Sequence, residues 1–244
     1  MINGTTFYTS EAALDYGFYT HSAETLNLIQ QKVVISPAEP KVDFLDIPGS
    51  DGSLDKSEIY GRIYYKDRTI TWTFAVRPED DWYSKQTQVS NALNGQRLYI
   101  RLDEDMDHYY YGRIRVTNYN RDRMLMQITV VATVAPWRYL YGITEVVETL
   151  TTTEKYVELT NRVRPVVPDI LINQDTILGF RDSATSTWKT VTYTVETPGL
   201  FEKIPTTSLL EEGFEIGREL YPITARTAAA VSGDIQINYI KADL

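Results

Sequence analysis

The chain has few side chains of the kinds that carry out covalent chemistry. It contains no cysteine, which excludes a disulfide, a thiolate nucleophile and a cysteine-based zinc site. Its two histidines are His21, within YTHSAE, and His108, directly after Asp107. Neither belongs to a nucleophile elbow or to a paired metal-binding motif, and we expect both to be polar surface or turn residues. The sequence offers no catalytic set, so we predict that the chain is not an enzyme and needs no cofactor.

A run of alternating acidic residues matches the start of a calcium-binding loop. Asp103, Asp105 and Asp107 occupy the first, third and fifth positions of an EF-hand pattern. The pattern then fails, because His108 stands where a glycine must allow a sharp turn and Ile114 stands where a glutamate must chelate the ion. We therefore expect a solvated hairpin tip and no metal site.

Basic residues gather on the segment that follows. Arg113 and Arg115 fall on one face of an expected strand, and Arg121 and Arg123 lie at the next turn, with tyrosines between them. This is the one plausible nucleic-acid patch in the sequence. However, the chain has a net charge of −9, and the acidic residues at 103–107 lie one hairpin away. A subunit interface or an ordinary exposed face is favoured over nucleic-acid binding.

Two further groups of residues relate to sugar chemistry. Glu211 and Glu212 are expected to form a surface pair, because neighbours on a strand point to opposite faces and cannot converge as a glycosidase dyad. Trp188 and Tyr193 differ in parity on one expected strand, so they cannot form a joint stacking platform. Tyr193 is expected to face the core, which leaves Trp188 as the better candidate for an exposed platform. A carbohydrate-binding module that recognises a cell-wall polymer is therefore the alternative function.

The elements that must position these residues are mainly β-strands. Apolar residues alternate in short runs along most of the 244 residues, and 18 tyrosines add to the β-propensity. One helix is predicted over 78–95, because Pro78 suits its first turn, Glu79 suits its N-terminal end and Gly95 suits its C-cap. The fold class predicted is mainly β.

Patterning also divides the chain into two domains. Strand patterning restarts after the polar segment 151–155, which places a boundary near 138–150. We predict a β-sandwich or barrel-like domain with one α-helix and long hairpins over 1–142, and a second β-sandwich over 143–244. No apolar run approaches the ~20 residues of a membrane span. The N-terminal residues lack the basic and apolar regions of a signal peptide, so neither a membrane location nor a signal peptide is expected.

Several short motifs stand in a fixed order along the chain. They are FYTSEAALDYGFYT (7–20), LDIPGSDGSLD (45–55), the corner Tyr65–Arg68, the helix, YYYGRI (109–114) and Ala135–Trp137. In this order they resemble the distal tail proteins of long-tailed phages that infect Gram-positive bacteria. The resemblance marks these positions as structural motif residues: Pro48, Gly49, Asp51, Gly52, Arg68, Tyr110, Gly112, Pro136 and Trp137.

The resemblance implies a structural virion protein located at the tail tip or baseplate. Such proteins form a homo-hexameric ring that joins the major tail tube protein to the tail-associated lysin or tail fibre. They also anchor the host-adsorption apparatus, including a receptor-binding protein in some phages. DNA passing through the ring is the only nucleic-acid contact expected. The first domain is implied to build the ring, and the second is implied to be a galectin-like sandwich.

Overall fold

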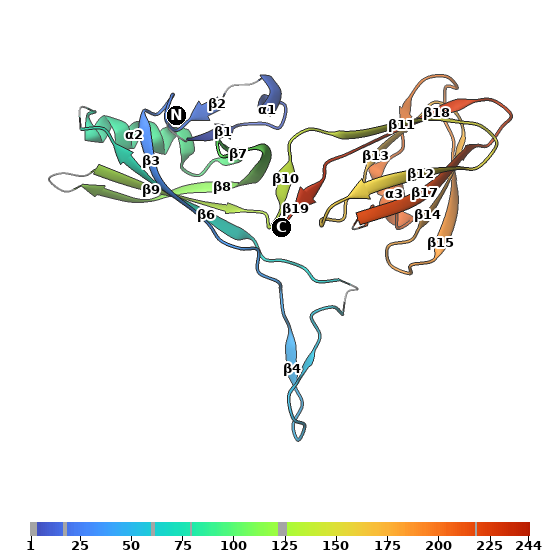
Figure 1. Cartoon of the computed structure of the whole chain (residues 1–244), viewed down its shortest axis with the longest axis horizontal. Coiled ribbons are helices and arrows are strands. Elements are labelled where there is room, and N and C mark those ends of the chain that lie inside the picture. Colours follow the sequence, from blue (N-terminus) through green and yellow to red (C-terminus); the bar gives the residue numbers. More distant parts are fainter. Residues whose placement is uncertain (1–3, 17–18, 60–61, 79, 122–125, 218) are drawn as a thin grey trace. The chain divides into compact units, whose positions relative to one another are not determined.

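The computed structural model describes residues 4–16, 19–59, 62–78, 80–121, 126–217 and 219–244 (Figure 1). The chain divides into two compact units, which are Met1–Arg138 with Leu244 (unit 1) and Tyr139–Asp243 (unit 2). Both units consist mostly of antiparallel strands, so the predicted mainly-β fold class is confirmed.

Unit 1 is built on one large antiparallel sheet. Its strands run in the order β2-β1-β7-β8-β9-β6-β3. Their bounds are β1 Thr5–Tyr8, β2 Tyr19–His21, β3 Leu28–Ile35, β6 Arg68–Val76, β7 Arg97–Leu102, β8 Asp105–Arg121 and β9 Met126–Val134. Two helices belong to this unit, α1 Ala13–Tyr16 and α2 Trp82–Leu93. The consecutive strands β7, β8 and β9 pair in order as a meander.

The sheet of unit 1 curls so that its two end strands meet. A tight loop joins β2 to β3, with Asn27 in the left-handed region at φ 51° and the Leu28 N–H donating to the Ser22 carbonyl at 2.9 Å. Inside, the buried Thr5 hydroxyl accepts from Trp72 Nε1 at 3.0 Å and donates to Gln30 Oε1 at 2.7 Å. This arrangement agrees with the barrel-like form expected from the sequence.

Helix α2 covers this unit but begins later than predicted. The helix starts at Trp82, because the Asp81 carboxylate caps it by accepting from the Ser84 N–H at 2.8 Å. The predicted start at Pro78 is therefore wrong, and Glu79 lies outside the described residues. The predicted end is confirmed, with Asn94 as C-cap and Gly95 following at φ 77°. The α2 residues Trp82, Val89 and Leu93 enter the core of unit 1.

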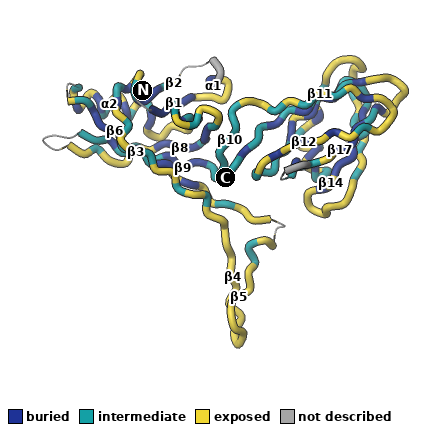
Figure 2. The backbone as a smooth tube through the Cα atoms, viewed as in Figure 1, coloured by how far each residue is buried: buried dark blue, intermediate teal, exposed yellow. Residues whose placement is uncertain are grey.

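A long excursion leaves the sheet between β3 and β6. Residues 36–67, here called the arm, carry the short hairpin of β4 Phe44–Asp46 and β5 Ser53–Asp55. An antiparallel bridge between Pro40 and Tyr65 closes its root. Every residue from Pro40 to Asp55 is exposed, whereas the strands that flank the arm carry buried residues (Figure 2).

Unit 2 is a sandwich of two four-stranded antiparallel sheets. One has the order β11-β18-β13-β16 and the other β12-β17-β14-β15. Their bounds are β11 Thr144–Leu150, β12 Lys155–Asn161, β13 Asp169–Ile172, β14 Thr176–Arg181, β15 Trp188–Tyr193, β16 Glu202–Lys203, β17 Glu219–Thr227 and β18 Gly233–Tyr239. Residues of both sheets, such as Ile235 and Phe180, form one apolar core. The galectin-like detail stays a prediction.

Several small elements of the chain were not foreseen, among them helix α1, which gives unit 1 two helices and not the one predicted. Helix α3 Thr206–Glu211 lies in unit 2, and short strands β10 Arg138–Leu140 and β19 Ala242–Asp243 pair with each other. Glu211 and Glu212 lie at the end of α3 and not on a strand, so the reason given for excluding them as a dyad is wrong. Among the described residues, no helix combines the length and apolar character needed to cross a membrane.

Replacing Gly112 by alanine should destabilise unit 1. The new Cβ would lie 2.1 Å from the Thr133 carbonyl oxygen and 2.6 Å from the Val134 Cα, so β8 and β9 would have to separate. Overpacking costs about 1–3 kcal/mol, and a clash with backbone belongs at the upper end. Denaturant titration measures the loss. Gly217→Ala is the control, because its nearest contact would be 3.6 Å from Tyr221. If Gly112→Ala and Gly217→Ala have the same free energy of unfolding, the expected clash between β8 and β9 is contradicted.

Replacing Asp182 by asparagine should reduce the acid sensitivity of unit 2. Hydrogen bonds from the Thr185 N–H, Lys189 and the Ala184 N–H hold the pKa of Asp182 well below its ordinary value of 3.8. A depressed folded-state pKa contributes stability above the unfolded-state pKa, and this contribution is lost as the pH falls below about 4. Asp182→Asn should therefore melt at a lower temperature at pH 7 and lose less between pH 7 and pH 3. If the melting temperature of the wild type and that of Asp182→Asn fall by the same amount between pH 7 and pH 3, the prediction is refuted.

Candidate functional site

The predicted motif residues fall at the two ends of the arm. Pro48, Gly49, Asp51 and Gly52 form the tip of the β4–β5 hairpin. The other five gather where the arm leaves the sheet, on β6, on β8 and directly after β9: Arg68, Tyr110, Gly112, Pro136 and Trp137. The nine residues therefore do not form one site. Four of them lie at the tip of the arm, and the other five lie at its root.

The tip owes its shape to proline and glycine. The Ser50 N–H donates to the Ile47 carbonyl at 3.1 Å, with Pro48 and Gly49 between them. Gly49 has φ 83°, as a type II turn requires after proline. Gly52 has φ 79° at the start of β5 and is also open to solvent. The sequence signal therefore specifies a stable hairpin end that projects from unit 1.

The arm exposes more apolar surface than a solvated loop requires. Its exposed fractions are 56% for Val42, 58% for Phe44, 46% for Leu45, 46% for Ile47 and 50% for Leu54. Apolar residues gathered in this way on a projecting segment indicate an interaction site. The hairpin is isolated from any third strand, and a lone two-stranded hairpin is only marginally stable in water. A partner that covers the hairpin would bury its apolar side chains and would stabilise the isolated pair of strands.

The root of the arm is fixed by aromatic contacts. Tyr65 packs edge-on against Trp137, with ring centroids 5.6 Å apart. Arg68 is buried, and its guanidinium lies 5.0 Å from the centre of the Tyr110 ring. Gly112 pairs with Val134, which pairs with Arg68, so all three lie in one row across β8, β9 and β6.

Burial shifts the titration of this stacked pair. Desolvation lowers the pKa of Arg68 and raises the pKa of Tyr110. The Nε and Nη2 atoms of Arg68 are buried without a hydrogen-bond partner in the described chain, so the Tyr110 ring is their main compensation. The motif positions Arg68 and Tyr110 therefore act as one structural pair that anchors the start of β6.

The histidines are not surface residues, contrary to expectation. His21 is 7% exposed, and its Nε2 lies 3.2 Å from an Asp103 carboxylate oxygen. His108 is partly buried, and its Nδ1 lies 2.7 Å from Asp105 Oδ1, while Arg138 Nη1 donates to the other Asp105 oxygen at 3.1 Å. The predicted hairpin tip is confirmed by a turn at Asp103–Glu104, with Glu104, Met106 and Asp107 exposed, but Asp103 and Asp105 are partly buried. Partners from β2 (His21) and from β10 (Arg138) draw Asp103 and Asp105 inward.

These contacts also separate the carboxylates of the predicted acidic turn. Asp103 is directed to His21 and the Gly4 N–H, whereas Asp105 is directed to His108 and Arg138. Within the described residues, no group of three or more acidic or histidine side chains is arranged to hold a metal ion.

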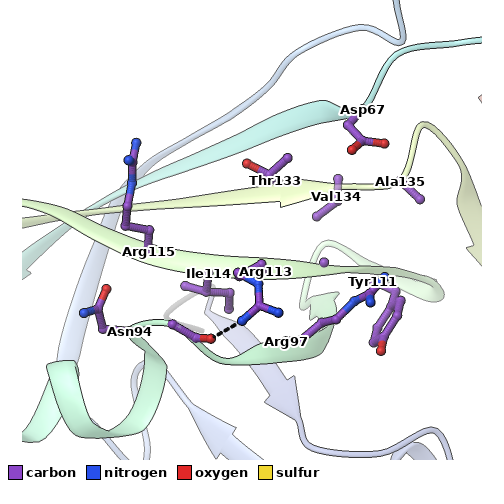
Figure 3. A pocket seen from close by; sticks show the side chains of 12 residues that line it. Asp67, Asn94, Arg97, Tyr111, Arg113, Ile114, Arg115, Thr133, Val134 and Ala135 are labelled. Atoms are coloured by element: carbon purple, nitrogen blue, oxygen red, sulfur yellow. Dashed lines mark hydrogen bonds between the residues drawn. The ribbon is translucent and has the colours of Figure 1, made fainter.

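A basic groove lies on the exposed face of β7, β8 and β9 (Figure 3). It has a volume of about 690 Å³, and its charged side chains are Arg97, Arg113, Arg115 and Asp67. Arg97 stands directly opposite Arg113 in the β7–β8 register. Its guanidinium lies 4.7 Å from the Tyr111 ring, and Arg113 Nη1 donates to the Gly95 carbonyl at 2.7 Å. None of the three arginines has a carboxylate ion-pair partner in the described chain.

The groove joins residues that sequence reasoning treated separately. Arg113 and Arg115 were recognised as a basic pair, and they share one face of β8 as expected. Arg97 was missed, because its place beside Arg113 depends on the strand register. The alternation within RLYIRL was the only signal that could have indicated it. Arg121 ends β8 outside the groove, and Arg123 lies outside the described residues.

The sugar-related residues behave as the parity argument predicted. Trp188 is 49% exposed at the start of β15, and Tyr193 packs against the core of unit 2. The indole of Trp188 lies over Gly179, where an added Cβ would be 3.0 Å from its ring. Burial raises the pKa of Tyr193 to about 12. Trp188 is therefore a packed side chain at the edge of a sheet with one open face.

Calcium should leave the stability of this protein unchanged. The Asp103 and Asp105 carboxylates already bind different partners, so they cannot converge on one ion. The melting temperature should be the same in EDTA and in millimolar Ca²⁺, since a specific ligand would raise it by mass action. A rise that disappears in Asp105→Ala, but not in a control Asp51→Ala, would overturn this expectation.

Comparison with known proteins links most of unit 1 to a phage tail family. Residues 21–131 match the family model described as the phage tail protein RIFT-related domain. No curated protein matches the chain.

Among solved structures, the crystal structure of the Dit (gp 19.1) protein of phage SPP1 has a TM-score of 0.67 and 15% identity. The match covers 99% of this chain and 99% of that one. It is described as a paradigm of the hub adsorption apparatus in phages that infect Gram-positive bacteria. A structure of infectious bursal disease virus, strain Gx, has 10% identity over 97% of this chain and 67% of that one, but its TM-score of 0.19 carries no argument. The resemblance to distal tail proteins is thus supported: residues 21–131 match the phage tail protein RIFT-related domain, and the whole chain has the fold of the SPP1 Dit protein.

Proposed function

We propose that this protein is a structural hub protein that forms a ring at the distal end of a phage tail. The tail-protein domain over 21–131 and the Dit fold over nearly the whole chain support this proposal. Both point to a structural role in the tail and away from a catalytic one. The alternative, a carbohydrate-binding module, is not favoured by these comparisons.

The observation that carries the proposal is the exposed arm. A segment of 32 residues, 36–67, leaves the sheet and keeps its apolar side chains in solvent. Its tip is shaped by Pro48 and Gly49, and its root is fixed by the Tyr65–Trp137 contact. A projecting hairpin that exposes apolar side chains is suited to a head-to-tail contact between identical subunits.

The finer parts of the proposal concern partners and place. We propose a homo-hexameric ring built by residues 1–142, with 143–244 as an appended domain. The ring would join the major tail tube protein to the tail-associated lysin or tail fibre and would support host adsorption, with a receptor-binding protein as a further partner. The protein would then reside in the virion tail tip, and DNA would only pass through the ring.

Deleting the arm should abolish self-assembly without unfolding unit 1. Pro40 and Tyr65 bridge the root, so a short glycine–serine linker can replace 41–64. That segment adds no residue to the apolar core, and the melting temperature should change little. Light scattering should give an oligomer for the full chain and a monomer for the deletion variant, and negative-stain images of the full chain should show rings.

Fragments test which unit builds the ring. A 1–142 fragment should assemble, and a 143–244 fragment should stay folded and monomeric. The proposal fails if the full chain remains monomeric at high protein concentration. The assignment of roles is reversed if only the 143–244 fragment oligomerises.

A further inference from the structure

The basic groove of unit 1 carries an unbalanced charge. Arg97 and Arg113 stand directly opposite on neighbouring strands, with side chains on the same face, and Arg115 follows two residues along β8. Like charges in directly opposite positions destabilise a sheet. The only carboxylate among the described residues that line the groove belongs to Asp67. In a chain of net charge −9, this face lacks an anionic partner.

The arm carries the opposite charge. Between Phe44 and Asp55 the chain has three aspartates and no basic residue. The β4–β5 register places Asp46 and Asp55 on one face of the hairpin, and Leu45 directly opposite Leu54 on the other. Hydrogen bonds from Ser57 lower the pKa of Asp55, so this carboxylate is charged at neutral pH. The hairpin therefore offers one face with Asp46, Asp55 and Phe44 and an opposite face with Leu45 and Leu54, both exposed.

We propose that the groove binds the β4–β5 hairpin of a second copy of this chain. The inference rests on the proposed ring and names the contact that closes it. Asp46 and Asp55 of one copy would pair with Arg113, Arg115 and Arg97 of the next. The groove also presents Tyr111 and Ala135, against which Phe44 can pack, because it lies on the same face of the hairpin as Asp46 and Asp55. Opposite charges at a desolvated contact fix register and exclude other orientations.

The occupant is a second copy, because the hairpin of the same chain lies out of reach. Asp67 lines the groove and also ends the arm, so the root of the arm lies beside its own groove. The hairpin is at the far end of the arm and points away from the sheet of unit 1 (Figure 1). An extended chain from Ser36 to Pro48 reaches up to about 40 Å, which is enough to span to a neighbouring subunit. A contact between two different surfaces repeats from copy to copy, and it closes a ring when the rotation between neighbouring copies divides a full turn.

Charge reversal in the full-length protein tests this contact. The groove variant is Arg113→Glu/Arg115→Glu, and the arm variant is Asp46→Lys/Asp55→Lys. All four residues are exposed, so each variant should fold with the melting temperature of the wild type. Each variant alone places like charges at the contact, and its mass by light scattering should fall to that of one chain. The control Arg121→Glu/Arg181→Glu makes the same change in net charge at exposed sites outside the groove, and it should assemble like the wild type.

Mixing the two variants gives the decisive measurement. In a one-to-one mixture, the acidic arm of one variant meets the basic groove of the other, and the basic arm meets the acidic groove. The mixture should recover the wild-type mass with the two chains alternating, and the recovered complex should weaken as the salt concentration rises.

The outcomes separate this inference from the proposed function. If the wild type assembles and the single variants also assemble, or the mixture fails to recover, the groove does not bind the arm although the ring stands. If the wild type never assembles, the proposed function fails and the inference fails with it. If the groove variant assembles normally but loses binding to a double-stranded DNA oligonucleotide that the wild type binds, the occupant is nucleic acid and the inference is overturned.

Discussion

Unit 1 depends on bringing together the two ends of a long antiparallel sheet. An open sheet presents unpaired backbone groups at both ends, and a native protein must cover them. Here the end strands β2 and β3 are consecutive in the chain, and the loop between them joins them through the Ser22 carbonyl and the Leu28 N–H. Thr5 then connects Trp72 on β6 with Gln30 on β3 across the interior. The buried hydroxyl is useful because it donates one hydrogen bond and accepts another.

This closure determines where the chain can extend outward. Helix α2 is tied to the β2–β3 loop by Lys85, whose ammonium donates to the Leu26 carbonyl at 3.0 Å and pairs with Asp80 at 3.5 Å. The arm leaves where β3 ends and β6 begins, beside the stacked pair of Arg68 and Tyr110. A rigid root and a rigid tip with an exposed segment between them allow the arm to project from unit 1 without disturbing its core.

Charge is distributed unevenly over this acidic chain. Within unit 1, the Asp103 carboxylate contacts His21, and the Asp105 carboxylate contacts His108 and Arg138. The carboxylates of Asp46 and Asp51 stay at the exposed end of the arm. Arg97, Arg113 and Arg115, on the outer face of β7 and β8, have no carboxylate ion-pair partner among the described residues. Net charge alone suggested repulsion from anions, but local geometry creates a basic surface on the same molecule.

The sequence by itself determined the local features of this protein. Alternating apolar residues specified the strands, Pro48–Gly49 specified a turn, and Gly95 ended the helix, because each depends only on a few neighbouring residues. The order of such motifs also indicated the phage tail family. Tertiary structure alone decided that His21 meets Asp103, that Arg97 stands beside Arg113, and that the arm is exposed. These features depend on strand register and on contacts between residues far apart in the chain, and local patterning contains neither.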